Sequence, residues 1–384
     1  MTKYFTPLIL LSLPLISSFA AEPQVGSGET DGYKLVWQDL FDGGELNLDR
    51  WVIEVNGDGG GNNELQYYKA ENVSVGDDGQ GNGCLILTAR REDYKGKKFT
   101  SGRLNTLHKV TFTHGKVEAS IKLPKTANGL WPAFWMMGDD FSEVGWPACG
   151  ETDILEMGNS NGMNRGTSER YFNGACHWGT RWDQVGDYAR DATWDYSLQD
   201  NAFHLYTCIW DQNFIRMYVD MDKYPEKAPY YEIDISKIDW NDGWCAGNYF
   251  HKPNFIIFDL AIGGNFTGIW DAAKITALND ANGQEASMYV NYLKIYQKGV
   301  DNETFHANVP GDDLEDVTPG GTDNPGGTDG IAEVAGNAQE GVTVFNAGGL
   351  RVAHAASADE ALSRLTPGLY IVKSGNTTKK IIVK

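Results

Sequence analysis

The chain has few basic clusters and, after its first 20 residues, no long apolar run. No later stretch approaches the roughly 18 continuous apolar residues that a membrane-spanning helix needs. The formal charge is −20, and a strongly acidic protein is repelled by nucleic-acid phosphates and anionic lipids. We therefore expect no membrane insertion and no nucleic-acid partner. A neutral polymer suits this charge better, although acidity also serves simply to keep an exported protein soluble.

Cysteine is scarce and widely spaced. The five residues include no C-x-x-C pair, so a zinc site of that type is not indicated. In an oxidising compartment an odd number leaves at least one thiol unpaired. Cys149, two residues before Glu151, is equally compatible with a buried free thiol and with a disulfide, and a nucleophilic role for a thiol is disfavoured.

The N-terminus has the features of a cleaved signal peptide. Lys3 precedes the apolar run from Pro7 to Ile16, and Ser18 and Ala20 are small residues at the two positions that a signal peptidase reads. We expect residues 1–20 to be removed and residues 21–32 to form a short linker. The predicted destination is outside the cell or on its surface, with the periplasm as the alternative.

The centre of the chain, residues 33–298, has the pattern of a β-protein. Polar and apolar residues alternate over residues 116–123, over residues 203–220 on both sides of a turn at residues 211–213, and over residues 289–296. Many short strands, frequent glycine and no sustained helical periodicity favour an all-β, antiparallel β-sandwich over α/β layers.

One predicted strand in this region, residues 151–156, carries three acids. In a regular strand Glu151 and Asp153 share one face, and Glu156 points to the opposite face. A β-bulge between Asp153 and Glu156 would add one residue and bring all three acids onto a single face. Bulges re-aim side chains in this way beside active sites.

Two glutamates on one face could act on either side of a sugar. In retaining glycoside hydrolysis one carboxylate attacks the anomeric carbon and the other protonates the leaving oxygen, at a separation of about 5 to 5.5 Å. Asp153 could hydrogen-bond the nucleophile and, through like-charge coupling, keep a neighbouring acid protonated near neutral pH. An exposed acidic edge strand, or a calcium site of hard oxygen ligands, fits the same spacing.

The surrounding motifs carry a family resemblance. Tryptophan-rich segments at residues 129–138 and 145–150 precede the acids, and further motifs lie at residues 62–68, 100–103, 115–119, 177–178 and 260–265. With these motifs, residues 33–298 resemble glycoside hydrolase family 16, and specifically its laminarinase branch. The resemblance implies a concanavalin-like jelly roll of two curved sheets, with an open cleft across the concave one. An open cleft favours cleavage inside long chains.

The resemblance also implies roles for individual residues. It makes Glu151 the nucleophile, Glu156 the general acid/base and Asp153 their helper. The proposed platforms for sugar stacking are Trp131, Trp135 and Trp146. Arg103 and Asn63 are proposed to make polar contacts with sugars in the negative subsites. His177 is expected at the edge of the cleft. Pyranose rings stack their apolar C–H faces on aromatic side chains. The ordinary alternatives are core packing for the tryptophans, and an ion pair, a turn residue or a structural histidine for the others.

Two positions depart from the family pattern and bear on metal binding. Asp39-Leu40-Phe41 and Val290-Asn291-Tyr292 each lack an acid that relatives commonly carry. The chemistry requires no cofactor, and a structural calcium ion would meet less charge here, so the metal site is left unassigned. The loop at residues 56–61 lacks the acidic ligand series of an EF-hand and is interpreted as a flexible cleft-edge loop.

After residue 298 the composition changes. Residues 299–330 contain a near-repeat of Pro-Gly-Gly-Thr-Asp and are predicted to be a linker. Residues 331–384 are predicted to form a small β module, with strands at residues 341–346, 368–373 and 379–384. Its G-x-Y-x-V-K strand and basic, aliphatic end resemble the sorting domain of type IX secretion substrates, which implies the secretion machinery as a partner. A carbohydrate-binding module is the competing interpretation.

The sequence therefore predicts a monomeric, exported, endo-acting retaining hydrolase of β-1,3-glucan or mixed-linkage β-1,3/1,4-glucan. A different family 16 activity, such as a transglycosylase or a galactanase, shares the same catalytic strand. A lectin-like sandwich that binds glycan without cutting it is the third hypothesis.

Overall fold

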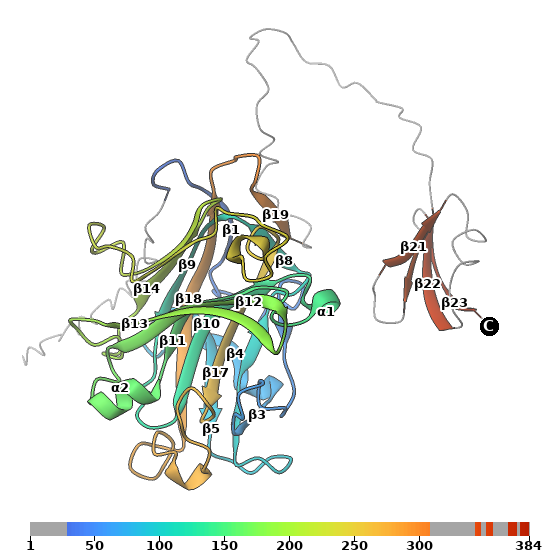
Figure 1. The fold of residues 1–384 in the computed structure, drawn as a ribbon. Helices are drawn as coiled ribbons and strands as arrows, with labels where there is room; N and C mark the ends of the chain where they lie inside the picture. The colour runs from blue at the N-terminus through green and yellow to red at the C-terminus, as the bar shows by residue number, and fades with distance from the viewer. Residues whose placement is uncertain (1–28, 308–341, 347–350, 356–367, 375–376, 384) are drawn as a thin grey trace, which may run out of the picture. The chain divides into compact units, whose positions relative to one another are not determined.

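The computed structural model describes residues 29–307 and, in the C-terminal part, the backbone of strands within residues 342–346, 351–355, 368–374 and 377–383. The chain divides into two compact units, Met1–Gly321 and Thr322–Lys384 (Figure 1). The predicted signal peptide and most of the predicted linker lie outside the described residues. Among the described residues the longer of the two α-helices has six residues, so none is long enough to cross a membrane.

The first unit contains two large β-sheets. The order in the 10-stranded sheet is β16-β15-β14-β9-β18-β5-β6-β3, with β1 added to β18 and β4 to β5. Its only parallel pair among the described strands joins β3 and β6. The bounds are β1 (Lys34–Asp39), β3 (Gln66–Tyr68), β4 (Val73–Asp77), β5 (Gly83–Arg90), β6 (Phe99–Ser101), β9 (Gly115–Lys122), β14 (His204–Trp210), β15 (Phe214–Val219), β16 (Tyr231–Asp234) and β18 (Glu285–Gln297).

The second sheet has nine strands and carries the acid-rich strand. Its order is β13-β12-β11-β10-β17-β7-β2, with β8 on β17 and β19 on β8. The bounds are β2 (Val52–Ile53), β7 (Arg103–Asn105), β8 (Val110–Thr113), β10 (Leu130–Gly138), β11 (Glu151–Met157), β12 (Tyr171–Arg181), β13 (Gln184–Thr193), β17 (Asn254–Ile262) and β19 (Thr304–Ala307). The short helices are α1 (Phe141–Val144) and α2 (Ser160–Arg165), with 3-10 turns η1 (Ala70–Asn72), η2 (Ala246–Asn248) and η3 (Ala272–Lys274). The predicted antiparallel sandwich is confirmed.

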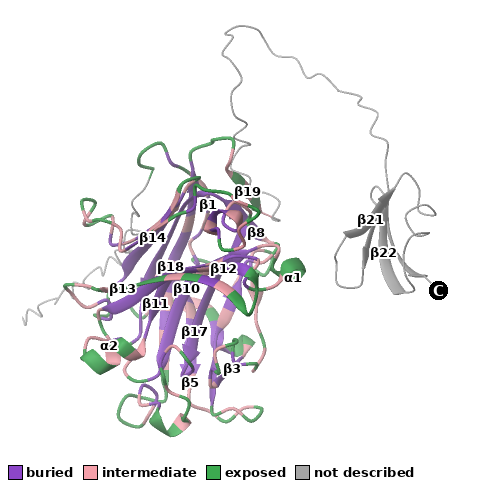
Figure 2. Ribbon diagram, in the orientation of Figure 1, coloured by how far each residue is buried: buried purple, intermediate pink, exposed green. Residues whose placement is uncertain are grey.

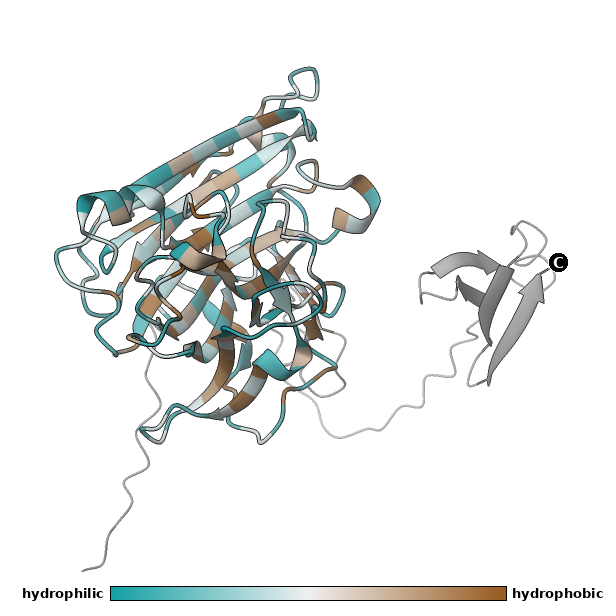
Figure 3. Ribbon diagram, turned by 90° about the horizontal axis from the view of Figure 1, so that it is seen from below, coloured by the Kyte–Doolittle hydropathy of each residue, from teal (hydrophilic) through white to brown (hydrophobic). Residues whose placement is uncertain are grey.

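Apolar side chains from both sheets form one core between them. Leu293 and Val117 from the first sheet belong to the same buried cluster as Phe134 and Phe258 from the second. Figure 2 shows the buried residues along the central strands, and Figure 3 shows hydrophobic and hydrophilic residues alternating along strands. Phe134 and Phe258 pair in register and stack with their ring centroids 4.9 Å apart. Phe134 faces the core, and because successive side chains alternate faces, the next residue, Trp135, is turned to the opposite face of the sheet.

The first unit extends beyond the predicted boundary at residue 298. Strand β19 pairs with β8 in antiparallel register from Thr304 to Ala307. The side chain of Gln297 donates to the backbone oxygens of Thr113, at 3.1 Å, and of Thr304, at 2.9 Å, and so ties the extension to the sheet. The boundary was therefore placed too early, because the composition changes before the last strand of the sheet is complete.

The second unit contains a four-stranded antiparallel sheet in the order β21-β20-β22-β23. The three predicted strands are present as β20 (Val342–Asn346), β22 (Gly368–Ser374) and β23 (Thr377–Val383). Strand β21 (Arg351–Ala355) was not predicted. The role of this unit in sorting stays a prediction.

All five cysteines are free and buried. The disulfide alternative for Cys149 is therefore wrong in this structure, and the free-thiol alternative is confirmed. Burial raises the pKa of the Cys149 thiol to about 12, which keeps it protonated at neutral pH. A thiol in that state is a poor nucleophile.

Candidate active site

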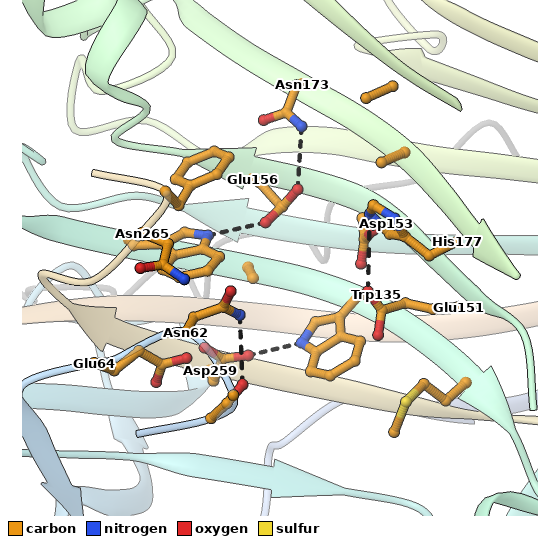
Figure 4. A pocket seen from close by; sticks show the side chains of 18 of the residues that line it. Asn62, Glu64, Trp135, Glu151, Asp153, Glu156, Asn173, His177, Asp259 and Asn265 are labelled. Carbon is orange, nitrogen blue, oxygen red and sulfur yellow. Dashed lines mark hydrogen bonds and ion pairs between the residues drawn. The ribbon is translucent and has the colours of Figure 1, made fainter. Parts of the chain in front are cut away.

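The three acids of β11 are brought together by an irregularity in the sheet. Asp153 pairs with Ala175 of β12, whereas Glu156 pairs with Asn173, so three steps along β11 match two along β12. This extra residue is the predicted β-bulge, and Glu151, Asp153 and Glu156 all line one cleft (Figure 4). The predicted parity change between Asp153 and Glu156 is confirmed.

The entry into β11 depends on Gly150. Its φ of +74° lies in the left-handed region, and a Cβ at this position would stand 2.9 Å from the backbone oxygen of Tyr249. Glycine adopts this conformation without steric cost. The tight approach places Glu151 at the start of the strand, at the rim of the cleft.

Glu156 is held by two donors from neighbouring strands. The indole Nε1 of Trp131 donates to its Oε1 at 3.0 Å, and the amide of Asn173 donates to its Oε2 at 3.1 Å. Both carboxylate oxygens are therefore oriented before any substrate binds. Asn173 was missed by the sequence analysis, because only the pairing of β11 with β12 brings it next to Glu156.

Glu151 and Asp153 share a histidine neighbour. Nε2 of His177 lies 3.4 Å from Oδ2 of Asp153 and 4.0 Å from Oε1 of Glu151. Burial lowers the pKa of His177, so it is mainly neutral at pH 7. The three side chains also present ligand atoms within 4.8 Å of one another, a spacing that could hold a cation.

The surroundings of Glu151, Asp153 and Glu156 raise the pKa values of all three carboxyl groups. Burial is the largest cause that raises the pKa of Glu151 to about 7 and that of Glu156 to about 8. Burial also raises the pKa of Asp153, followed by the charges of Glu151 and Glu156. Three carboxylates in one buried site do not all ionise together at neutral pH. One can therefore serve as an acid while another is ionised.

The three predicted tryptophans all line the cleft, in different environments. The ring of Trp131 is 8% exposed and stacks on Phe266 with a centroid distance of 4.6 Å, so one of its faces is covered. Trp135 is half-buried. Trp146 is 39% exposed and its ring centroid lies 6.4 Å from that of His177. Trp146 is thus the most accessible of the three for sugar stacking.

Arg103 and Asn63, the two residues predicted to make polar contacts with sugars, differ in their positions. Arg103 lines the cleft, and its Nε lies 2.9 Å from Oε1 of Glu54. Asn63 is not among the cleft-lining residues; its backbone has a φ of +58°, and its amide donates to Oδ1 of Asn265 at 3.0 Å. Its partner Asn265 and its neighbour Asn62 both line the cleft, and a sugar contact by Asn63 stays a prediction.

The structure adds cleft residues that the sequence analysis did not select. The polar ones are Asn62, Glu64, Asn159, Asn173, Asp191, Asp259 and Asn265. A signal for Asp259 is present in the sequence, since it is the only charged residue in β17, which is apolar from Phe255 to Phe258 and from Leu260 to Ile262. Such a residue is expected to be buried only with partners.

The departures from the family pattern are Leu40 and Asn291, and both Asp39, next to Leu40, and Asn291 make hydrogen bonds within the protein. Asp39 accepts from the indole of Trp51 at 2.9 Å and from the backbone of Phe41 at 3.1 Å. The amide of Asn291 donates to the backbone oxygen of Gly83 at 2.8 Å. These contacts leave oxygen lone pairs on both side chains, so calcium binding stays a prediction and no metal is assigned.

Comparisons with known proteins agree with this geometry. The profile of "Glycosyl hydrolases family 16" matches residues 63–250. The chain is 34% identical over 267 residues to the clotting factor G alpha subunit of Tachypleus tridentatus, covering 69% of this chain but only 34% of that protein. It is also 34% identical over 266 residues to a glucan endo-1,3-beta-glucosidase of Cryptopygus antarcticus, covering 67% of this chain and 88% of that protein.

Solved structures give the same result. A mixed-linkage glucan family 16 enzyme of Bacteroides ovatus, in complex with an oligosaccharide product, has 42% sequence identity and a TM-score of 0.60, with 68% of this chain and 100% of that chain covered. The catalytic domain of an endo-1,3-beta-glucanase (laminarinase) from Thermotoga petrophila has 28% identity and a TM-score of 0.54, covering 69% and 98%. The sandwich fold, the bulged acid strand and these relatives together lead to one conclusion: the chain belongs to glycoside hydrolase family 16.

Proposed function

We propose that this protein is an exported, endo-acting retaining β-glucanase and that mixed-linkage β-1,3/1,4-glucan is its preferred substrate. The observation that carries the proposal is the β-bulge between Asp153 and Glu156, which turns both glutamates into one cleft. A regular strand would leave Glu156 facing the core.

The proposed reaction is a double displacement. The ionised carboxylate of Glu151 attacks the anomeric carbon, the C1–O bond breaks, and Glu156 gives its proton to the departing oxygen. Glu156 then takes a proton from water, whose oxygen attacks the same carbon and releases Glu151. The contacts from Trp131 and Asn173 fix the carboxyl of Glu156 for both proton transfers.

Asp153 assists by holding a proton. Its pKa is raised by burial and by the neighbouring glutamates, so it stays neutral while Glu151 ionises. A neutral Asp153 beside a neutral His177 adds no further negative charge to the site. This arrangement limits the charge that opposes formation of the Glu151 carboxylate.

The proposed preference for mixed-linkage glucan is supported by a comparison of sequence identities. The mixed-linkage enzyme of Bacteroides ovatus shares 42% identity with this chain, against 28% for the Thermotoga petrophila laminarinase. The relative from Cryptopygus antarcticus, named a glucan endo-1,3-beta-glucosidase, supports β-1,3-glucan as the second candidate. Export and a sorting role for residues 331–384 are part of the proposal, based on the N-terminal and C-terminal sequence patterns.

Product analysis on a glycan panel tests the proposal. Barley mixed-linkage glucan, lichenan, laminarin and agarose are incubated with the protein, and the products are sized over time. We expect a ladder of intermediate oligosaccharides from barley glucan and lichenan, slower cleavage of laminarin and none of agarose. Glu151→Gln keeps the side-chain size and serves as the inactive control. Faster cleavage of agarose than of any glucan, or normal turnover by E151Q, would refute the assignment.

A further inference from the structure

A second hydrogen-bonded cluster lies in the wall of the cleft, with Asp259 of β17 at its centre. Oδ1 of Asp259 accepts from the indole Nε1 of Trp135 at 2.7 Å. Its Oδ2 lies 3.3 Å from the hydroxyl of Tyr68. Asp259 is 5% exposed and lines the cleft. A buried carboxyl with two aromatic partners restricts the orientation of both rings.

Arg103 extends this cluster over the indole. Its guanidinium lies 4.9 Å from the ring centroid of Trp135, and Nε contacts Glu54 at 2.9 Å. Asp259 pairs in register with Arg103 on one side and with Ala133 on the other. Trp135 is therefore fixed at its nitrogen by Asp259 and covered on one face by Arg103. Figure 4 shows the bond between Trp135 and Asp259 within the cleft.

The charges in this cluster affect the pKa of the proposed nucleophile, Glu151. Burial lowers the pKa of Arg103, but Glu54, Asp259, Tyr68 and Glu64 all raise it, and the net change is upward. Burial raises the pKa of Asp259 to about 7, and the positive charge of Arg103 opposes that rise. Arg103 lowers and Asp259 raises the pKa of Glu151, so the cluster lies close enough to affect that carboxyl.

We propose that Asp259 is a positioning residue for substrate binding: it holds the indole of Trp135, and with it the stacked guanidinium of Arg103, as a rigid cleft wall for a sugar ring beside Glu151. This inference rests on the proposed glucanase function. An indole fixed before binding loses no rotamer freedom when a sugar packs against it. Truncation of Asp259 would free the indole and leave its N–H without a buried acceptor.

Two substitutions separate the effect of the hydrogen bond between Asp259 and Trp135 from the effect of the negative charge of Asp259. Asp259→Asn keeps an oxygen that can accept from Trp135, whereas Asp259→Ala removes it. Because misplacement of a positioning group costs about 10- to 100-fold in catalytic efficiency, we expect D259A to raise KM for barley glucan by about 10-fold with kcat little changed. D259N should restore most of the lost affinity.

A matched control is the pair of Asp39, at the end of β1 in the 10-stranded sheet, and Trp51, just before β2. Trp51 Nε1 donates to Oδ2 of Asp39 at 2.9 Å, and both residues are buried outside the cleft lining. Asp39→Ala removes the same kind of bond without changing a cleft-lining residue, whereas Asp39→Asn keeps an oxygen that can accept from Trp51. D39A should lower the melting temperature and leave KM unchanged, which separates a loss of positioning from a general loss of stability.

A second measurement does not depend on the substrate. In the full chain labelled with ¹⁵N-tryptophan, the indole signal of Trp135 is assigned by its loss in Trp135→Phe. We expect this indole to be ordered in the wild type and to become mobile in D259A.

The proposal is overturned if the Trp135 indole stays as ordered in D259A as in the wild type, if KM is unchanged in D259A, or if D259N loses as much affinity as D259A. Failure of the proposed function has a different signature. The wild-type protein would then cleave no β-glucan in the panel, while the indole signal would still decide whether Asp259 fixes Trp135.

Discussion

The indole nitrogen of Trp131 donates to Oε1 of Glu156 at 3.0 Å, across the pair of strands β10 and β11. Ala133 of β10 pairs with Glu156, so Trp131 is two residues along the same strand and faces the same side of the sheet. Its other contact is the stacked ring of Phe266. Trp131 therefore fixes the proposed acid and is itself fixed by packing.

Trp131→Phe should shift the basic limb of the pH–activity profile upward. The indole stabilises the ionised form of Glu156 and lowers its pKa, so its removal raises that pKa further above about 8. A hydrogen bond to a charged group contributes about 1.5–3 kcal/mol, equivalent to about one to two pH units. The measurement is kcat/KM on barley glucan from pH 4 to pH 10.

Trp146→Phe is the matched comparison for W131F. Trp146 lowers the pKa of Glu151, so its loss should raise the acidic limb instead. If both variants shift the same limb, the two glutamates do not have separate roles.

Glu156→Gln should depend on the leaving group of the substrate. General acid catalysis contributes about 10²- to 10⁴-fold, so hydrolysis of glucan should fall by that factor. Dinitrophenolate leaves a dinitrophenyl glycoside without protonation, so the first displacement by E156Q on this substrate should be nearly as fast as in the wild type. Rapid-quench kinetics measures the burst of dinitrophenol. Equal losses on both substrates would contradict the acid role of Glu156.

A buried ion pair outside the cleft predicts a pH dependence of stability. Nδ1 of His204 lies 2.7 Å from Oδ2 of Asp220, and both residues are buried. Burial lowers the pKa of His204, but the hydrogen bonds and negative charges of Asp220 and Asp200 together raise it above its ordinary value. The pKa of Asp220 is lowered to about 2, because its hydrogen bonds and the charge of His204 outweigh burial. The contribution of the histidine is thus complete below its unfolded pKa of about 6.5 and is lost as the pH rises through its higher folded value. The contribution of the aspartate is lost as the pH falls from about 4 toward 2.

His204→Gln should therefore remove the loss of stability that the wild type shows as the pH rises above about 6.5. Asp220→Asn should lower the free energy of unfolding by about 3 kcal/mol, since it leaves a buried partner without its counter-charge. Urea unfolding at pH 5.5, 7 and 8.5 measures both effects. Parallel pH profiles for wild type and H204Q would show that this pair does not titrate as described.

The buried thiols predict a simple chemical result. All five cysteines are free and buried, with four of them 0% exposed and Cys245 at 8%. Ellman's reagent should react with fewer than one thiol per chain in buffer and with five in guanidinium chloride without reductant. A smaller number in denaturant would reveal a disulfide.

The sequence predicted the parts of the site that depend on local pattern. Side-chain parity in residues 151–156 required a bulge, and the structure has one. Asp259 and Trp135 are 124 residues apart in sequence, and their contact follows from the pairing of β10 with β17. A single sequence gives no rule for that pairing. Asn173 was missed for the same reason.

The missed or misplaced elements are those with weak local signals. β19 has only four residues, Thr304–Ala307, two of which are polar. Such a strand is stabilised by its neighbour β8 more than by its own propensity.

The central claim is that the bulge sets Glu151 and Glu156 at the same sugar, with Glu151 as the nucleophile. A 2-deoxy-2-fluoro glucoside with a dinitrophenyl leaving group slows the second displacement and traps the glycosyl-enzyme, and mass spectrometry of a digest locates the label. The account predicts one sugar per chain, attached to Glu151. A label on Asp153 or Glu156, or hydrolysis of the reagent with inversion and no label, would contradict it.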